Sequence, residues 1–421
     1  MTSTMDERAS LRAFWAALPT EGRWLLSTVG IQTLGRGLTL PFTLIYINRI
    51  RGIDLDVAGL LMSLIFAAAF AVTGPGGSLV DRIGARLMVI AGTLSAIAGC
   101  LVMAFASTIW TIALACVLLG IANGVSWPAF NALISHVVTG RTRTQYFGIN
   151  FALVNLGIGV GGLLGGLVVS VDRPATFTAA FVGNAVCLLA PLALMLGPLR
   201  LLHGRADRTG HEDAAPVSYR QILRHPAVAW VSGVTFLGAF VGYGQIEAGM
   251  PAFAHEIARV STRVIGMSFA LNTLIIVAFQ FWMLRVIDGR RRTRVFMVMA
   301  AVWGLAWIIF GLSGLVPGGA SAIAFVIVYG AVFGFGETML QPTVPAIVND
   351  LAPDHQRGRY NALSSASYQM GSIVGPVVAG VMLDRHLPGG FIAVLVVGCA
   401  VLALMALQLE RHLTPEVNGL P

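Results

Sequence analysis

Three lone charged residues, Arg36, Glu247 and Glu337, lie inside long apolar runs of this chain. Arg36 is near the middle of the run from Trp24 to Ile47, which contains no acidic residue. A guanidinium group at mid-depth in hydrocarbon costs about 2.5 kcal/mol or more, so it should face a partner or a water-filled cavity. A carboxyl group in such surroundings is a candidate to gain and lose a proton. The three charges together predict a polar pathway through a membrane.

Each of these proton-coupling candidates also has a purely structural interpretation. Glu247 could form a static pair with Arg36 or with a hydroxyl group. Glu337 could hydrogen-bond the end of a neighbouring helix, and Arg36 could be a structural cation rather than a counter-charge or an anion site. Both interpretations stay open at this stage.

Other polar and aromatic side chains in the apolar runs are candidates to line a substrate cavity. The competing expectation is that buried amides hold helices together and that aromatic rings face lipid or core. The candidates are Gln32, Asn123, Trp127, Asn155, Phe240, Tyr243, Gln245, Asn272, Gln280 and Gln369. No Ser/His/Asp set and no metal-ligand spacing occurs in the sequence, so we expect no catalytic residue, no metal and no enzyme.

The composition is typical of a membrane protein. The chain has 421 residues, of which 56% are hydrophobic and only 11% charged, whereas soluble domains carry about 25% charged residues. All 27 basic residues are arginine, so a phosphate-binding loop that ends in Gly-Lys cannot occur, which disfavours an ATP-driven pump. The net charge of +8 comes from arginines in short loops, so we expect a lipid bilayer and no nucleic acid as partner.

Twelve apolar segments approach the roughly 20 residues that a helix needs to cross a bilayer. They predict an all-α membrane protein with twelve transmembrane helices in two pseudo-symmetric six-helix bundles. The segments cover residues 24–47, 57–79, 87–106, 109–137, 145–170, 176–200, 227–252, 264–286, 295–313, 321–348, 360–383 and 389–409.

A polar stretch at the midpoint separates the two halves. We expect a cytoplasmic N-terminal segment (1–23), an N-terminal bundle (24–202), a cytoplasmic linker (203–225), a C-terminal bundle (226–410) and a cytoplasmic tail (411–421). With both termini in the cytoplasm, the inner segments hold 20 arginines and the outer loops hold six. The positive-inside rule favours this orientation, in the inner or plasma membrane.

The two halves also repeat each other at an offset of 214 residues. Duplicated halves around a midplane site are the architecture of secondary transporters. The pairs at this offset are Gly161 with Gly375, Asn123 with Glu337, Pro128 with Pro342, Arg143 with Arg357, and Tyr146 with Tyr360.

Two motifs carry a resemblance to a known family. The stretch Gly77-Ser78-Leu79-Val80-Asp81-Arg82-Ile83-Gly84-Ala85-Arg86 resembles the cytoplasmic loop signature of the major facilitator superfamily. The glycine runs at 157–166 and 371–380 resemble the antiporter motif of that family, with Gly162 in place of its proline in the first run. The resemblance implies gating roles for Asp81, Arg82, Arg86, Gly161, Gly375 and Pro376. The alternatives are an ordinary positive-inside loop and plain helix packing.

The segments around Arg36, Glu247 and Glu337 resemble those of twelve-helix drug–proton antiporters within this superfamily. The resemblance implies export of an amphipathic small molecule, with a cation among the candidate substrates, by alternating access, with the proton gradient as energy source and no cofactor. It also implies a monomer. Gly120 occupies the expected position of the family's fourth-helix arginine, so coupling has to rest on other residues.

Two other functions remain open. A lipid or glycolipid flippase would use Arg36 for an anionic headgroup. A membrane sensor or assembly partner would have the same fold and move no substrate.

Overall fold

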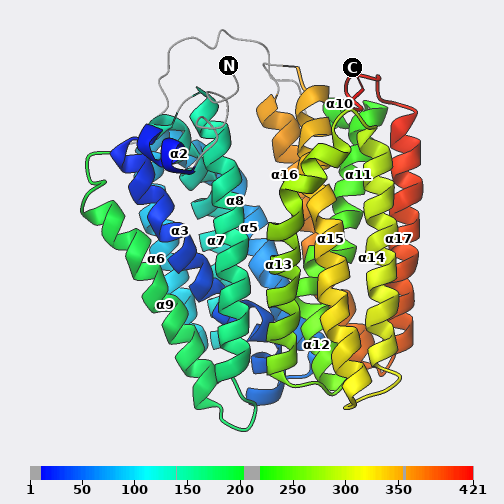
Figure 1. Ribbon diagram of the computed structural model, residues 1–421. Coiled ribbons are helices and arrows are strands. Elements are labelled where there is room, and N and C mark those ends of the chain that lie inside the picture. Colours follow the sequence, from blue (N-terminus) through cyan, green and yellow to red (C-terminus); the bar gives the residue numbers. More distant parts are fainter. Residues whose placement is uncertain (1–10, 139, 203–218, 354–356, 421) are drawn as a thin grey trace.

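The computed structural model describes residues 11–138, 140–202, 219–353 and 357–420. Within these ranges the chain is a bundle of long, roughly parallel helices (Figure 1). Helix α2, the short α10 and the C-terminal residues lie at the same end of the bundle, which we call the linker end (Figure 1). The opposite end, where α12 lies, is called the far end.

The helices form because long apolar stretches leave no alternative for the backbone polar groups in lipid. The N-terminal half contains α2 (Leu11–Ala17), α3 (Thr20–Thr39), η2 (Leu40–Phe42), α4 (Thr43–Ile45), η3 (Tyr46–Ile50), α5 (Leu55–Ile83), α6 (Ala85–Phe105), α7 (Ile109–Val137), α8 (Gly140–Val168) and α9 (Ala175–Leu196). The C-terminal half contains α10 (Tyr219–Leu223), α11 (Pro226–Val241), η4 (Gln245–Gly249), α12 (Met250–Glu256), α13 (Thr262–Ile287), α14 (Arg292–Ser313), α15 (Ala320–Leu351), α16 (Arg357–Asp384) and α17 (Pro388–Glu410).

Eleven helical stretches of the described chain are long and apolar enough to cross a membrane, and they match eleven of the twelve expected segments. The remaining segment, 24–47, is folded as α3 followed by η2, α4 and η3. Proline at 41 cannot donate a backbone hydrogen bond, and the helix tightens there into the 3₁₀ turn η2. The prediction of an all-α membrane fold is confirmed.

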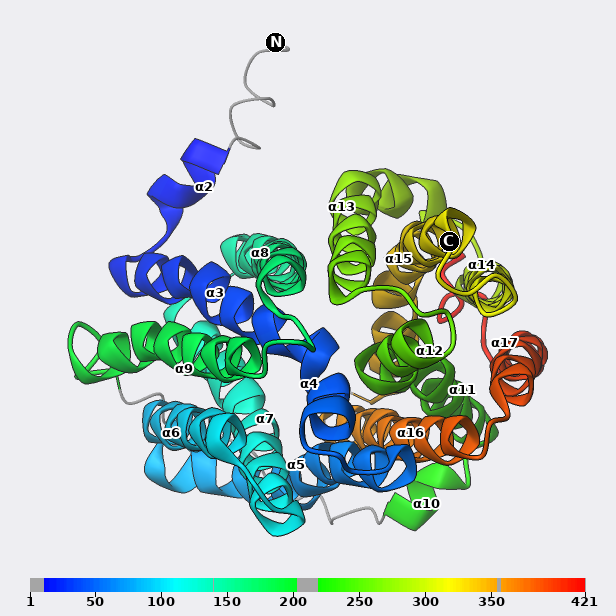
Figure 2. The ribbon, with the colours of Figure 1, turned by 90° about the horizontal axis from the view of Figure 1, so that it is seen from below.

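Two bundles stand side by side when the molecule is viewed from the far end (Figure 2). One contains α3 and α5–α9, and the other contains α11–α17. Helix α5 packs against α16, and α8 packs against α13, so these two pairs join the halves.

The sequence repeat is visible in the packing within each half. A Cβ atom on Gly161 would lie 2.1 Å from the backbone oxygen of Leu34 in α3, and one on Gly375 would lie 2.9 Å from Cα of Gly244. The first and fifth membrane segments of the N-terminal half therefore pack backbone to backbone, and so do the seventh and eleventh segments, which are their equivalents in the C-terminal half. Small residues permit this close approach.

Contacts between the halves are close in the far half of the bundle. A Cβ atom on Gly59 of α5 would lie 2.3 Å from the backbone oxygen of Pro376, and one on Gly266 of α13 would lie 2.5 Å from that of Gly162. Thr262 donates a hydrogen bond to the backbone oxygen of Val169 at 2.7 Å. Towards the linker end the ribbons of the two halves diverge (Figure 1).

Candidate functional site

An ion pair between Arg36 and Glu247 bridges the two halves at mid-depth. One guanidinium nitrogen of Arg36 lies 3.3 Å from Oε1 of Glu247. Arg36 is in the last turn of α3, and Glu247 is the central residue of η4, a π-helical turn. Such turns widen a helix locally and are common at functional sites. The side chains are 46% and 19% exposed, so the pair lies at a surface between the halves rather than inside a sealed core.

The second acidic candidate, Glu337, lies in α15 and is only 8% exposed. Its Oε2 accepts a hydrogen bond from the side-chain amide of Asn272 in α13 at 3.2 Å. The Tyr243 side chain, in the turn before η4, also hydrogen-bonds to it. Three elements of the C-terminal half therefore meet at this carboxyl group.

Tyr368 of α16 interacts electrostatically with both acidic residues, although no sequence pattern singles it out. Its hydroxyl is within electrostatic reach of Glu247, Arg36 and Glu337. The Tyr368 and Tyr243 ring centroids are 5.6 Å apart. The only sequence signal for Tyr368 was its position next to the amide candidate Gln369. The structure thus groups Arg36, Glu247, Glu337, Asn272, Tyr243 and Tyr368, which we call the central polar cluster.

Three cavity candidates lie inside the C-terminal half in this conformation. Gln245 has no exposed surface, and its amide nitrogen donates to the backbone oxygens of Phe240 at 3.1 Å and Gly375 at 3.3 Å. Phe240 is 9% exposed within the hydrophobic core. The Gln280 amide donates to the backbone oxygen of Thr338 at 3.3 Å. The amide nitrogens of Gln245 and Gln280 therefore join neighbouring helical segments, whereas their side-chain oxygens are buried and have no hydrogen-bond partner among the described residues.

Two other amide candidates lie where the halves meet. Gln369 donates from its amide to the Thr73 hydroxyl in α5 at 3.3 Å, and the Thr273 hydroxyl of α13 donates to the backbone oxygen of Asn155 in α8 at 3.3 Å. Gln32 is half-buried and Asn123 is exposed. The side chain of Trp127 falls outside the described part of the chain.

The gating candidates are not gathered in one place. Arg86 donates from Nε to the backbone oxygen of Met195 at 2.8 Å, which ties α6 to the end of α9 within one half. Gly161 and Gly375 also lie at contacts within a half, whereas Pro376 lies at the contact with Gly59 between halves. The side chains of Asp81 and Arg82 are outside the described part of the chain.

A second ion pair between the halves, which no sequence pattern predicts, lies at the far end. Arg49 in η3 donates two hydrogen bonds to the carboxylate of Glu256 at the end of α12, the first from Nε at 2.6 Å. Both residues lie near the ends of their apolar runs. Charged residues are common there because they reach the headgroups or water, so the position of Arg49 or Glu256 alone does not indicate a site. We call this pair the far-end clasp.

Metal binding has no support in the described residues, where no group of three or more His, Cys, Asp and Glu side chains could hold an ion. The cluster instead contains a cation, two carboxyl groups and two phenols. Such a set can bind a charged ligand and exchange protons.

Comparison with known families gives a match over almost the whole chain. The sequence profile of the Major Facilitator Superfamily matches residues 25–326 and 259–421. The uncharacterized MFS-type transporter YdeE of Escherichia coli (strain K12) is 23% identical over 374 residues, covering 88% of this chain and 91% of the relative.

A resistance protein and a solved structure are also similar. The class C tetracycline resistance protein of Escherichia coli is 25% identical over 365 residues, covering 84% of this chain and 87% of the relative. The crystal structure of a POT family transporter in complex with 5-aminolevulinic acid superimposes with a TM-score of 0.77 and covers 95% of this chain and 97% of the other, at 15% identity. At that identity the likeness concerns the fold.

Proposed function

The chain belongs to the Major Facilitator Superfamily, and from this premise we propose that it exports amphipathic, cationic small molecules in exchange for protons. It is a multi-pass membrane transporter, and its family and relatives are transporters rather than enzymes. The similarity to a tetracycline resistance protein supports drug-like substrates.

The Arg36–Glu247 pair is the observation that carries the proposal. An ion pair requires the ionised carboxyl group, so protonation of Glu247 breaks it. Because its two members belong to different halves, the charge of one carboxyl group is coupled to a contact between the halves. A transporter that exchanges protons for substrate needs such a link between protonation and conformation.

The proposed cycle begins with the two halves apart at the linker end and Glu247 ionised. A cationic substrate enters between the halves and competes with Arg36 for the Glu247 carboxylate. The halves then rock about the central polar cluster, and the site opens towards the far end. A proton from that side neutralises Glu247, which releases the substrate. After the return, Glu247 gives its proton to the linker side and pairs again with Arg36.

Glu337 gives the cycle a second place for the proton. The phenol of Tyr243 hydrogen-bonds to Glu337, and Tyr368, whose ring centroid is 5.6 Å from that of Tyr243, interacts electrostatically with both Glu247 and Glu337. Phenols both donate and accept hydrogen bonds. A proton taken up at Glu247 could therefore be passed to Glu337 within the C-terminal half. Asn272 would hold the Glu337 carboxyl group in place through its amide.

The proposal also includes the orientation of the protein in its membrane. The linker end would face the cytoplasm, as the arginine distribution favours, and the far end would face outwards from the inner or plasma membrane. The protein would work as a monomer with the proton gradient as its only energy source. No cofactor is assigned.

The flippase alternative is weaker because it needs Arg36 free for an anionic headgroup, whereas Arg36 is paired with Glu247. The flippase would be favoured if the purified protein moves lipid between leaflets and Arg36→Ala abolishes this movement. Absence of flux of every tested dye and lipid would instead favour the sensor.

The proposed function is tested with purified protein in liposomes and a fluorescent cationic dye. An imposed pH gradient should drive dye uptake against its concentration gradient in proteoliposomes and not in protein-free liposomes. Because one pH unit corresponds to about 1.4 kcal/mol, exchange of one proton per dye should support an about tenfold dye gradient per pH unit. A dye concentration ratio across the membrane that does not change with the imposed pH gradient would contradict proton coupling.

The far-end clasp yields a prediction about conformation. Arg49→Gln should shift the population towards the outward-open state about two- to fivefold, since partly exposed ion pairs contribute about 0.5–1 kcal/mol. The measurement is the distance distribution between spin labels at Asp54 and Val316, on opposite halves of the far end. The exchange Arg49→Glu with Glu256→Arg should restore the wild-type distribution.

The matched control is Arg291→Gln, which breaks an ion pair with Glu410 within the C-terminal half. It should leave the distances at the far end unchanged. If Arg49→Gln does the same, the clasp does not stabilise the closed far end.

A further inference from the structure

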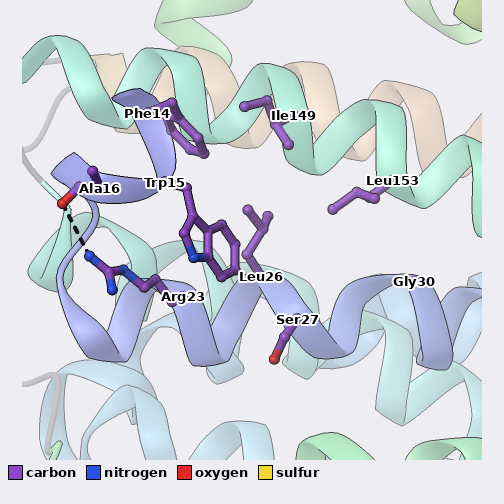
Figure 3. Close-up of a pocket in the computed structure, with 9 residues that line it drawn as sticks. All are labelled: Phe14, Trp15, Ala16, Arg23, Leu26, Ser27, Gly30, Ile149 and Leu153. Atoms are coloured by element: carbon purple, nitrogen blue, oxygen red, sulfur yellow. Dashed lines mark hydrogen bonds between the residues drawn. The ribbon is translucent and has the colours of Figure 1, made fainter. Parts of the chain in front are cut away.

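A groove lies on the outer surface of the N-terminal half at the linker end, away from the central polar cluster. It has a volume of about 750 Å³ and is formed by α2, the first turns of α3, and α8 (Figure 3). Its lining is mostly apolar: Phe14, Trp15, Ala16, Arg23, Leu26, Ser27, Gly30, Ile149 and Leu153.

The groove faces the lipid rather than the passage between the halves. Successive residues of a helix are rotated by 100°, which places Arg36 about 180° around α3 from Ser27 and about 140° from Arg23. Since Arg36 points to the other half, Ser27 and Arg23 point away from it. Helix α2 is not loosely attached, because Phe14 and Leu18 are buried in the hydrophobic cluster of this half.

The lining of the groove combines one cation with an exposed tryptophan. Arg23 and Trp15 both line it, and Trp15 is 43% exposed. Tryptophan is enriched at the level of lipid headgroups. Glu21, the nearby acid, lies about 160° around α3 from Arg23 and does not line the groove.

Arg23 is held in position and keeps donors for a ligand. Its Nε donates to the backbone oxygen of Leu18 at 3.0 Å, and one terminal nitrogen donates to that of Ala16 at 3.1 Å (Figure 3). These bonds use two of the five N–H groups of a guanidinium. Within the described residues, the other three are available to a phosphate, which arginine binds through paired hydrogen bonds.

We propose that this groove binds one anionic phospholipid of the leaflet at the linker end. The phosphate lies at Arg23, and one acyl chain lies along Leu26, Gly30, Ile149 and Leu153. An apolar channel that ends at a cation and a tryptophan fits an acyl chain joined to a negatively charged headgroup. The bound lipid fastens α2 to α3 and α8. This site is separate from the proposed transport cycle.

The test counts retained lipids by native mass spectrometry of the full chain in detergent. The probes are dioleoylphosphatidylglycerol, dioleoylphosphatidylcholine and glycerol 3-phosphate, each added separately. The wild type should retain one phosphatidylglycerol, with about fivefold preference over phosphatidylcholine, as expected for one arginine near an anionic lipid. Arg23→Gln should remove the preference, and Arg23→Lys should restore part of it.

A second variant tests the channel without touching Arg23. A Cβ atom on Gly30 would meet nothing within 4 Å, so Gly30→Leu can fold and fill the groove. It should lower retention of phosphatidylglycerol about fivefold or more, because the acyl chain loses at least one or two buried methylene groups. The matched controls are Arg285→Gln, an exposed arginine of the C-terminal half, and Gly389→Leu, a far-end glycine with equally open surroundings. Both should retain lipid as the wild type does.

Four results would overturn the proposal. The first is unchanged phosphatidylglycerol retention in both Arg23→Gln and Gly30→Leu, and the second is equal retention of phosphatidylcholine by the wild type. The third is full competition by glycerol 3-phosphate. The fourth is a wild type that appears as a dimer in the mass spectrum and becomes a monomer in Gly30→Leu. The third would indicate a site for free anions, and the fourth a contact between copies of this chain.

Discussion

Glu247→Gln is expected to abolish accumulation of a cationic dye driven by a pH gradient, and to leave dye exchange at equal pH measurable only at a higher dye concentration, because the dye loses its carboxylate partner. Glutamine has the size of glutamate but cannot bind and release a proton. With no proton to carry, the dye ratio across the membrane should fall from about tenfold per pH unit to about one. The measurement is dye uptake into proteoliposomes with and without an imposed gradient.

The matched control for this variant is Glu256→Gln, which removes the other acidic residue of the same helical run. Glu256 belongs to the far-end clasp, so its loss should change the conformational population but leave the dependence on the pH gradient. Full gradient-driven accumulation by Glu247→Gln would exclude Glu247 as the proton carrier. Loss of exchange even at a saturating dye concentration would point to a structural role.

Gly59→Leu is expected to stop transport by preventing the far end from closing. A Cβ atom at this position would lie 2.3 Å from the backbone oxygen of Pro376 in the other half. Backbone atoms on both sides cannot move aside without separating α5 from α16. Overpacking of this kind costs about 1–3 kcal/mol, which corresponds to an about five- to 150-fold shift towards the outward-open state. The spin-label distances between Asp54 and Val316 should lengthen accordingly.

Two other glycines separate this effect from misfolding. Gly161→Leu meets the Leu34 backbone oxygen within one half, so it should lower the thermal stability without favouring one conformation. Gly389→Leu lies at the far end in open surroundings and should transport normally. If Gly59→Leu remains folded and transports like the wild type, the contact between Gly59 and Pro376 does not have to form during the cycle.

The helical membrane fold could be predicted from the sequence because the apolar runs have the roughly 20 residues that a membrane-spanning helix needs, about twice the length of a spanning β-strand. The glycine repeat was equally informative. Gly161 and Gly375 proved to lie at equivalent backbone contacts, since only residues without a side chain permit them. The break at Pro41 in the first segment was less predictable, because a proline in a membrane helix can be accommodated in several ways.

The central polar cluster was only partly predictable. Arg36, Glu247 and Glu337 stood out because isolated charges are costly in lipid, and their pairing or hydrogen bonding was one of the interpretations left open. Tyr368 did not stand out, because a tyrosine in an apolar run is as common at a lipid surface as in a site. Gln245 and Gln280 carried the same sequence signal as Asn272, and their hydrogen bonds to backbone oxygens depend on helix packing that no local pattern specifies.

The far-end clasp illustrates a further limit. Arg49 and Glu256 are 207 positions apart, and each alone is an ordinary charge at the end of a span. Only the arrangement of the two halves brings them together. A sequence repeat predicts that the halves are alike, but it does not predict which of their side chains meet.

The most direct test of the account is whether water reaches Arg36. A charged, membrane-impermeant methanethiosulfonate reagent should modify Arg36→Cys from the linker side in a variant whose four native cysteines are replaced, because a thiol must ionise in water to react. Leu404, whose side chain is 62% exposed, belongs to helix α17 at the periphery of the bundle (Figure 2), and Leu404→Cys should stay unmodified in the same vesicles. Modification of Arg36→Cys at a rate at least tenfold above that of Leu404→Cys is the result the account predicts. Equal rates would place Arg36 against lipid and contradict a wet passage between the halves.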